Sequence, residues 1–385
     1  MNCSTFFKEE RLKVKWISLF CLLCVEIACV QSPTPNLLES QQSIWDSSQV
    51  AGPPVTRTQA VLKAHTFARI HWTMTEQNLR GANCDNHFIS DYPLGPRIGM
   101  GYKWGGWDTV EDFIDKIVTG HGTGTGANVS YTYYPFDCVT GISCTGLVSR
   151  AWHLDEKYTL TYPNQPEVPN QFHEISHAVP GVILSTGKTE NVKKGDAFMN
   201  ATHIILFIYE TRDGFPMVID SRRNGVRLRK ESWVSLGSQG YYVLRYNNIQ
   251  EDVHLSGTRE NPIFIQSFPY THDYNTCAVV SKDFDRYNIE SSANQQGPEV
   301  IYHFTLTESA TIRIHVTDIK YEGINNDVFL LESLDVDTSR KAVDCIDAGD
   351  NDIEHTLEAG SYYISVDSNW DLPGEYTLTV SHISD

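Results

Sequence analysis

The carboxy-terminal third of this chain is built from short segments in which apolar and polar residues alternate. Separated by turn residues, these segments are VIYHFTL (300–306), TIRIHV (311–316), DVFLL (327–331), YYISV (362–366) and EYTLTV (375–380). Because successive side chains of a strand point to opposite faces, each segment predicts a strand with one buried face. Short strands at this spacing favour an all-β sandwich over residues 264–385.

The charge of the chain changes at nearly the same place. The 385 residues carry a net charge of −18. From Ile263 onward there are 22 acidic and 6 basic residues, which leaves 26 acidic and 24 basic residues for the rest. Such different balances indicate two domains, with a linker at 251–263. Neither part has the basic excess of a nucleic-acid binder, so we expect no nucleic-acid partner.

The amino terminus has the pattern of an export signal. Basic residues between positions 8 and 15 precede an apolar run at 16–29, which is shorter than the roughly 20 residues of a membrane span. We therefore expect a signal peptide at 1–31, a Pro- and Ser-rich linker at 32–56, and a secreted or periplasmic protein. Cys29 follows Ile-Ala as in a lipoprotein signal, which makes it a candidate lipid anchor at the cell envelope.

Between residues 57 and 250 helical patterns come first and strand patterns follow. An apolar stripe predicts a helix over 57–78, and CTGLVSRAW (144–152) suits a second, short helix. The segments that resemble strands are GDAFMN (195–200), HIILFIYE (203–210), FPMVIDS (215–221) and YYVLRY (241–246). This order predicts an α+β domain with helices packed on a small antiparallel sheet or barrel.

The cysteines of an exported protein meet an oxidising compartment, where an odd number leaves at least one thiol unpaired. Those beyond the signal are Cys84, Cys138, Cys144, Cys277 and Cys345. Cys144 begins the predicted short helix, where unpaired N–H groups and the helix dipole stabilise a thiolate and can receive an oxyanion. Cys138 lies ahead of this helix and gains neither effect. Cys144 is therefore the candidate nucleophile.

A cysteine nucleophile also needs a base and a group that orients the base. His203 opens one apolar strand and Asp220 ends the next, and pairing of these strands would bring the two side chains together. His203 would then accept the thiol proton of Cys144, and Asp220 would fix the histidine tautomer. The competing interpretation is structural, because a cysteine at a helix start is commonly a small buried hydrophobe.

The ordered motifs resemble the NlpC-type family of bacterial cell-wall cysteine peptidases, which has a papain-like fold. The motifs are GYKWGG (101–106), SCTGLVSRAW (143–152), KKGDAFMN (193–200), HIILFIYE (203–210) and VIDS (218–221). The resemblance covers about residues 57–246. It implies that Cys144 is the nucleophile, His203 the base and Asp220 the orienting residue.

The same resemblance implies further roles around the cleft. Tyr102 would lie near the oxyanion site, and Trp104, Gly105 and Gly106 would shape the cleft. Ser143 stands where the family has an Asp that helps to hold the free amine of the substrate. This departure, with Thr145 in place of the usual Ser, bears on specificity more than on chemistry.

The remaining cysteines are candidate disulfide partners. Cys138 follows an Asp but lacks Gly-Leu-Val at the family's distance, so we expect a structural role for it. Cys84 is its candidate partner, and Cys277 and Cys345 are a candidate second pair, although sequence alone does not fix connectivity. Cys144 would then be the odd thiol.

The acidic carboxy-terminal region has a resemblance of its own. GPEVIYHFTL, NNDVFLLES, EAGSYYISVD and GEYTLTV are similar to the bacterial pre-peptidase carboxy-terminal domain, a β-sandwich appended to secreted hydrolases. Together the two resemblances imply an exported, monomeric cysteine hydrolase that cleaves amide bonds in peptidoglycan stem peptides without a cofactor or metal. The alternatives are an inactive envelope-binding module, and an amidase or acyltransferase acting on other amides or lipids.

Two further patterns suggest metals. HEISH (173–177) matches the zinc signature of two His one helical turn apart. Pro169 and Pro180 leave little room for a helix there, so we favour a surface or cleft-rim loop over a zinc metallopeptidase. The acidic string at 335–354 has the carboxylates that suit Ca²⁺ but does not fit the EF-hand pattern, and we expect a solvated acidic loop.

Overall fold

The computed structural model describes most of the chain beyond residue 51. The described residues are 52–81, 84, 89–124, 137–155, 157, 172–176, 192–289, 295–318, 325–368 and 372–383. The expected signal peptide (1–31), with Cys29, and most of the expected linker (32–56) lie outside them. Within these ranges, no helix is long and apolar enough to cross a membrane.

The first helix, α1 (Arg57–Arg69), begins at a capping box. The Gln59 N–H donates to Thr56 Oγ1 at 3.1 Å, and the Thr56 N–H donates to Gln59 Oε1 at 2.9 Å. These bonds satisfy two of the N–H groups that a helix start leaves without partners. The apolar stripe of the sequence faces the core, where its members are buried: Ala60, Val61, Ala64, Phe67 and Ala68.

The prediction that this helix continues to residue 78 is wrong. Ile70 is extended, with ψ of 136°, and the next residues form strand β2 (His71–Met74), paired antiparallel with β3 (Gly95–Ile98). The side chain of Trp72 in this strand is buried, and its indole N–H donates to the Gly99 carbonyl at 2.9 Å. Tertiary pairing here outweighs the helical spacing of the apolar residues. A separate short helix, α2 (Glu76–Arg80), follows.

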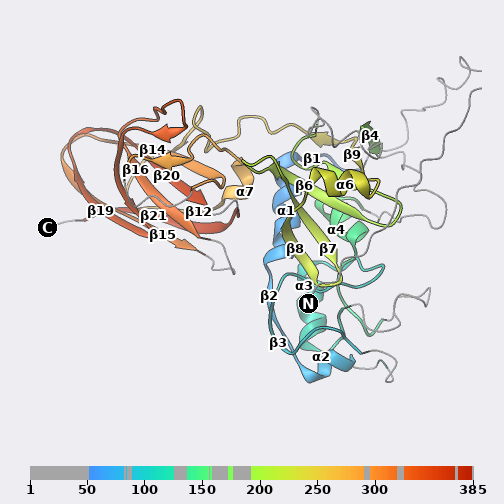
Figure 1. The fold of residues 1–385 in the computed structure, drawn as a ribbon. Helices are drawn as coiled ribbons and strands as arrows, with labels where there is room; N and C mark the ends of the chain where they lie inside the picture. The colour runs from blue at the N-terminus through green and yellow to red at the C-terminus, as the bar shows by residue number, and fades with distance from the viewer. Residues whose placement is uncertain are drawn as a thin grey trace, which may run out of the picture. The chain divides into compact units, whose positions relative to one another are not determined.

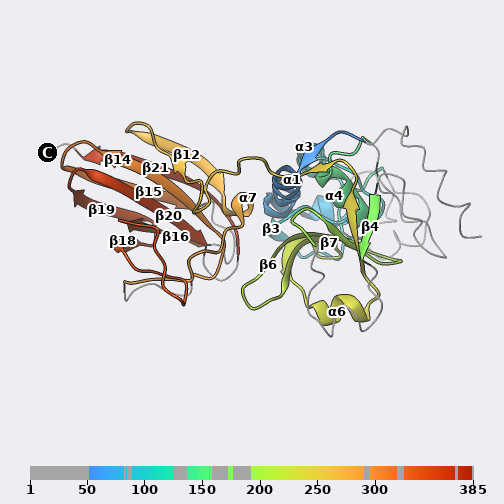
Figure 2. The same ribbon diagram turned by 90° about the horizontal axis from the view of Figure 1, so that it is seen from above.

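A six-stranded antiparallel sheet forms the centre of the first part of the chain. Its order is β4 (Phe172–Ser176), β9 (Tyr242–Tyr246), β5 (Ala197–Met199), β6 (Ile204–Glu210), β7 (Pro216–Arg222) and β8 (Gly225–Lys230). Helices α1 and α4 (Cys144–Ala151) pack on one face, and α6 (Trp233–Ser238) packs on the other (Figure 2). The predicted order of helices and then antiparallel strands is present. The remaining elements are α3 (Val110–Val118) and the parallel pair of β1 (Val55–Thr56) and β10 (Ile249–Gln250).

The Gly-Asp motif that precedes β5 explains how these helices and strands are held together. The fully buried Asp196 accepts hydrogen bonds from Arg57 Nη1 at 3.1 Å and from Arg245 Nη2 at 2.7 Å. The Trp152 indole N–H donates to the Gly195 carbonyl at 2.8 Å. These bonds connect α1, the end of α4, β5 and β9. Removing one partner of such a buried ion pair typically costs about 3–5 kcal/mol of stability, so the role of Asp196 is structural.

The HEISH segment is a strand and not the expected loop. Residues 172–176 form β4 and pair with β9. A strand turns successive side chains to opposite faces, whereas the zinc signature needs its residues one helical turn apart. His177, the second His of the motif, lies outside the described residues. The backbone of the described part is therefore unlike that of a zinc helix.

The carboxy-terminal part is a sandwich of two sheets that lie face to face (Figure 1). The first has the order β11 (Ile263–Phe264), β14 (Glu299–Leu306), β20 (Gly360–Ser368), β16 (Asn326–Leu331) and β18 (Cys345–Gly349). The second has the order β12 (Tyr270–Asn275), β21 (Glu375–Ile383), β15 (Ala310–Asp318) and β19 (Asp352–Leu357). The strands predicted from alternation are confirmed as β14, β15, β16, β20 and β21. The short helix α7 (Thr276–Val279) and the pair of β13 (Arg286–Tyr287) and β17 (Lys341–Ala342) complete this part.

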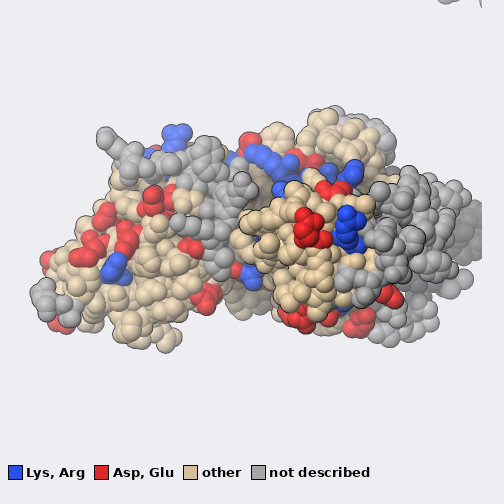
Figure 3. Space-filling model, turned by 90° about the horizontal axis from the view of Figure 1, so that it is seen from below, with Lys and Arg blue, Asp and Glu red and all other residues tan. Residues whose placement is uncertain are grey.

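The acidic string at 335–354 is not the expected loop, because it contains β17, β18 and part of β19. Its carboxylates still face outward in part, since Asp347 and Asp352 are partly exposed. Figure 3 shows acidic side chains gathered on the sandwich, at the left of that view. Every residue of β18 is partly buried, so this strand lacks the alternation of buried and exposed residues from which the other strands were predicted.

Three carboxylates form a row across three neighbouring strands of the sandwich. Glu299 of β14 lies opposite Asp367 of β20, which lies opposite Asp327 of β16. Glu299 and Asp367 are fully buried, and among the described residues neither forms an ion pair with Lys or Arg. Like charges directly opposite destabilise a sheet. Burial raises the pKa of Glu299 to about 8, and burial with the charge of Glu299 raises the pKa of Asp367 well above its usual range.

This row predicts a sandwich that loses stability as the pH rises. The pKa of Glu299 is about 8 in the folded protein, against an ordinary 4.5. The stability that its protonated carboxyl group contributes is therefore fully present below about pH 4.5 and is lost as the pH rises through 8. We expect the free energy of unfolding to fall by on the order of a few kcal/mol over this range. Glu299→Gln should remove much of this dependence. Amide hydrogen exchange of peptides from β14 and β20, measured at about pH 5 and pH 9, would reveal it, and equal dependence in both proteins would contradict the account.

Candidate active site

Cys144 is the first residue of α4, as the sequence predicts, and Ser143 is the residue that caps this helix. The Ser143 hydroxyl oxygen accepts a hydrogen bond from the Gly146 N–H at 3.1 Å. Both the N–H and the hydroxyl of Ser143 donate to the Gly106 carbonyl at 3.1 Å. Cys144 is 8% exposed. The helix start that carries the thiol is thus bonded directly to the GYKWGG loop.

Glycines allow this loop to approach the helix so closely. A Cβ on Gly146 would collide with the Gly106 carbonyl, and a Cβ on Gly106 would collide with the Gly141 carbonyl. Gly105 has a positive φ of 68°, which L side chains rarely adopt. The glycines of the GYKWGG and CTG motifs therefore serve backbone packing beside Cys144.

His203 and Asp220 come together at the end of the β6–β7 hairpin. Leu206 pairs with Ile219, and continuing this register places His203 opposite Arg222, with Asp220 as its diagonal neighbour on the same face. His203 Nε2 lies 2.7 Å from Asp220 Oδ1. Asp220 is fully buried and forms an ion pair with Arg222. The sequence-predicted pairing of the two strand ends is therefore present.

The pKa of His203 is raised to about 9. Burial alone would lower this pKa. The hydrogen bonds to Asp220 and to the Cys144 thiol, together with the negative charges of both groups, raise the pKa by more than burial lowers it. Because Nε2 is bonded to Asp220, Nδ1 is the ring nitrogen left for the sulfur. At neutral pH the imidazole is charged and offers Cys144 a charge-assisted hydrogen bond.

The other residues that the resemblance singled out lie around this group. Burial, with the negative charges of Cys144 and Asp220 among its neighbours, raises the pKa of Tyr102 well above its usual range, so its phenol stays a hydrogen-bond donor. Its backbone N–H donates to the Tyr92 hydroxyl at 2.9 Å. Trp104 is 42% exposed beside the glycine turn, in a position open to a ligand.

Three residues near the site were not singled out from the sequence. Lys157 donates from Nζ to the Gly105 carbonyl at 2.5 Å. The buried Tyr241 lies within range of the charges of Arg222, Asp220 and Cys144. Lys157 follows α4 outside any motif, so nothing in the sequence identifies it. The position of Arg222 near the site could have been inferred from the sequence, because Arg222 lies two positions beyond Asp220 and so shares its face of the strand.

The loop that leads to Cys144 is braced on two sides. The structure joins Cys84 and Cys138 by a disulfide bond, and next to it the Thr140 N–H donates to the Gly122 carbonyl at 2.7 Å. On the other side, the Thr140 hydroxyl donates to Asp108 Oδ2 at 2.6 Å. These contacts fix the segment 138–143 and hence the start of α4.

The candidate pair of Cys277 and Cys345 is not formed, and that prediction is wrong. Both are free thiols, Cys277 in the buried helix α7 and Cys345 on the edge strand β18. Counting cysteines could not reveal this, because membership of one domain does not bring two side chains together. Burial raises the pKa of Cys277 well above its usual range and that of Cys345 to about 12, so neither is prepared for nucleophilic attack.

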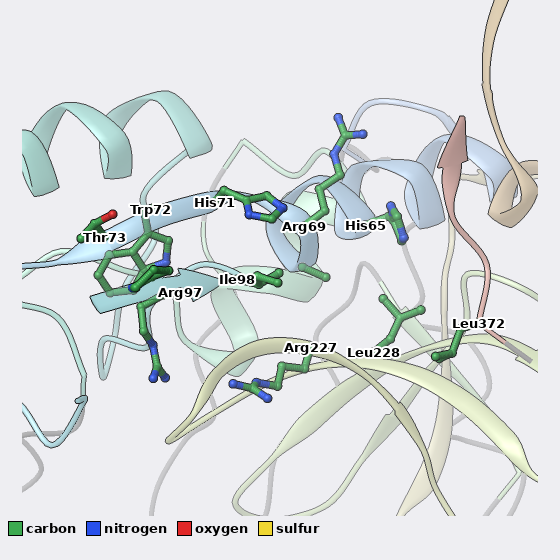
Figure 4. Close-up of a pocket in the computed structure, with 12 residues that line it drawn as sticks. His65, Arg69, His71, Trp72, Thr73, Arg97, Ile98, Arg227, Leu228 and Leu372 are labelled. Atoms are coloured by element: carbon green, nitrogen blue, oxygen red, sulfur yellow. The ribbon is translucent and has the colours of Figure 1, made fainter. Parts of the chain in front are cut away.

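A pocket of about 730 Å³ lies apart from Cys144. It is bounded by the end of α1, β2, β3 and β8 (Figure 4), and Arg69, Arg97, Arg227 and Trp72 are among the residues that line it. Cys144, His203 and Asp220 do not line it. In the part of the chain that the structure describes, no group of three or more His, Cys, Asp or Glu side chains is arranged to hold a metal ion.

No protein-family model matches the chain, and no curated protein matches it. Among solved structures, similarity is found to the pre-peptidase carboxy-terminal domain of a collagenase from Bacillus anthracis. The identity is 14% and the TM-score 0.22, over 34% of this chain and 100% of that one. Similarity is also found to PliG from Aeromonas hydrophila, a periplasmic inhibitor of g-type lysozyme. Here the identity is 12% and the TM-score 0.21, over 33% of this chain and 97% of that one. At these scores neither similarity carries an argument about the fold or the site of this chain.

The His203 interactions predict a titration that can be measured. Asp220→Asn removes a negative charge and leaves Arg222 close to the ring, so we expect the His203 pKa to fall from about 9 by about one unit or more. NMR titration of the imidazole in both proteins would measure the shift. Asp213→Asn, at the far end of the same hairpin, is the matched control. An unchanged pKa in Asp220→Asn would contradict the described contact.

Proposed function

We propose that residues 57–250 form a papain-like cysteine hydrolase and that the protein is exported to act on amide bonds in peptidoglycan stem peptides. The observation that carries the chemistry is the position of His203, which is hydrogen-bonded to the Asp220 carboxylate and lies close enough to Cys144 for that group to raise the His203 pKa as well. The substrate class is supported by the ordered resemblance of the motifs to cell-wall cysteine peptidases. In this proposal the β-sandwich is an accessory module outside the cell.

The first half of the proposed reaction forms a thioester. Because His203 is charged at neutral pH, it already carries the proton of the Cys144 thiol, and the Cys144 thiolate attacks the carbonyl carbon of the scissile amide. The backbone N–H of Cys144 at the helix start and the phenol of Tyr102 are the candidate donors to the oxyanion. His203 then protonates the leaving amine, the C–N bond breaks and the acyl group remains on Cys144.

The second half releases the acyl group. Water enters in place of the departed amine and gives a proton to His203 as its oxygen attacks the thioester carbonyl. The C–S bond breaks, the carboxylic acid leaves, and the Cys144 thiolate is restored beside the protonated His203. Throughout, Asp220 keeps the ring in one orientation and stabilises the imidazolium form.

We expect purified protein to cleave muropeptides at an amide bond, detected by mass spectrometry of the products. Cys144→Ala should lower kcat/KM by about 10³-fold or more, because the nucleophile, its base and the orienting acid act as a unit. Cys345→Ala, which removes a free thiol of the sandwich, is the matched control and should leave the rate unchanged. A chelator should have no effect.

Two outcomes would contradict this function. Activity that survives Cys144→Ala but is lost with chelator would replace the thiol mechanism by a metal-dependent one. Retention on isolated sacculi without cleavage of any muropeptide, by wild type and Cys144→Ala alike, would make the protein an envelope-binding module.

A further inference from the structure

The cations around Cys144 are neutralised to different degrees. Arg222 pairs with Asp220 and Glu231, and Lys103 lies within the field of Asp108 and Asp137. Lys157 differs, because no described carboxylate forms an ion pair with it. Burial lowers its pKa, and the opposing influence is the negative charge of Cys144. Among the described residues, Lys157 is therefore a cation near Cys144 that lacks a carboxylate partner.

The position of Lys157 is fixed by the glycine loop. Its Nζ donates to the Gly105 carbonyl at 2.5 Å, and the next carbonyl, that of Gly106, accepts from the Ser143 N–H. Ser143 precedes Cys144 directly. The ammonium group is thus held on the loop that packs against the start of α4, and an ammonium has further N–H groups to offer a ligand.

The residue before the nucleophile offers no opposite charge. Ser143 is 4% exposed, and its hydroxyl is engaged with Gly106 and Gly146. A substrate ammonium would find no carboxylate at this position, and it would be repelled by Lys157. A substrate carboxylate would find an attractive partner. The charges described next to Cys144 therefore favour an anionic substrate group.

We propose that Lys157 forms a subsite that binds a carboxylate of the substrate next to the scissile amide. This inference rests on the proposed function and deepens it, because it selects stem peptides whose carboxylate is free over those in which it is a carboxamide. A half-buried ammonium that already holds one carbonyl loses less conformational freedom on binding than a mobile surface lysine. A charge-assisted hydrogen bond of this kind corresponds to a preference on the order of 10- to 100-fold.

The test separates binding from hydrolysis. Full-length Cys144→Ala protein is titrated by calorimetry with a stem peptide whose carboxylates are free, and with the same peptide in which each carboxylate in turn is a carboxamide. We expect one of these amidations to weaken binding on the order of 10-fold or more. Adding Lys157→Met should reduce that ratio to about two or less, and Lys157→Arg should restore part of it. Lys230→Met, on the opposite end of the hairpin from His203, is the control and should leave the ratio unchanged.

Each result has a distinct meaning. Equal affinity for all forms, or a preference that Lys157→Met leaves intact, would overturn the carboxylate subsite. A preference that depends on Lys157, together with an absence of hydrolysis by the wild type, would support the subsite and contradict the hydrolase. Hydrolysis by the wild type without any such preference would support the hydrolase and overturn the subsite.

Discussion

The hydrogen bonds of Ser143 determine the position of Cys144, the proposed nucleophile. Through its hydroxyl this residue ends the loop and begins the helix, and through its backbone and side chain it holds the Gly106 carbonyl. A serine cap is typically worth about 1 kcal/mol to a helix, but here the larger consequence is positional. Cys144 is placed at the start of α4, within reach of a histidine that belongs to a different element. The disulfide of Cys84 and Cys138 supports the same loop from its other end.

Buried carboxyl groups have different partners in the two parts of the chain. In the first part, Asp196 and Asp220 are fully buried and paired with arginines, and they hold neighbouring groups in place. In the sandwich, Glu299 and Asp367 are buried side by side and have no arginine or lysine partner among the described residues, and their pKa values are raised. Paired carboxylates can orient a base at neutral pH, whereas unpaired ones respond to pH. This contrast places the proposed chemistry in the first part and a pH-dependent stability in the second.

Much of the fold and of the site could be predicted from local patterns. Alternation located the central sandwich strands, and the step from helix to strand placed Cys144, His203 and Asp220 on elements that the structure brings together. Errors arose where a partner distant in sequence decides. Residues 71–74 have a helical pattern but pair with β3 as a strand. The acidic string was expected to be a loop but contains strands. Lys157 is held near the site by its hydrogen bond to the Gly105 carbonyl, and the spacing of residues in the sequence does not predict this contact.

The proposed mechanism requires Cys144 to form a covalent bond to the acyl part of the substrate. Rapid acid quenching of the wild-type protein with a stem-peptide substrate, followed by intact-mass measurement and peptide mapping, tests this claim most directly. We expect the protein to gain the mass of the acyl fragment, the fragment to map to Cys144, and the adduct to disappear as product accumulates. Product that forms while Cys144 carries no adduct at any quench time would contradict the account.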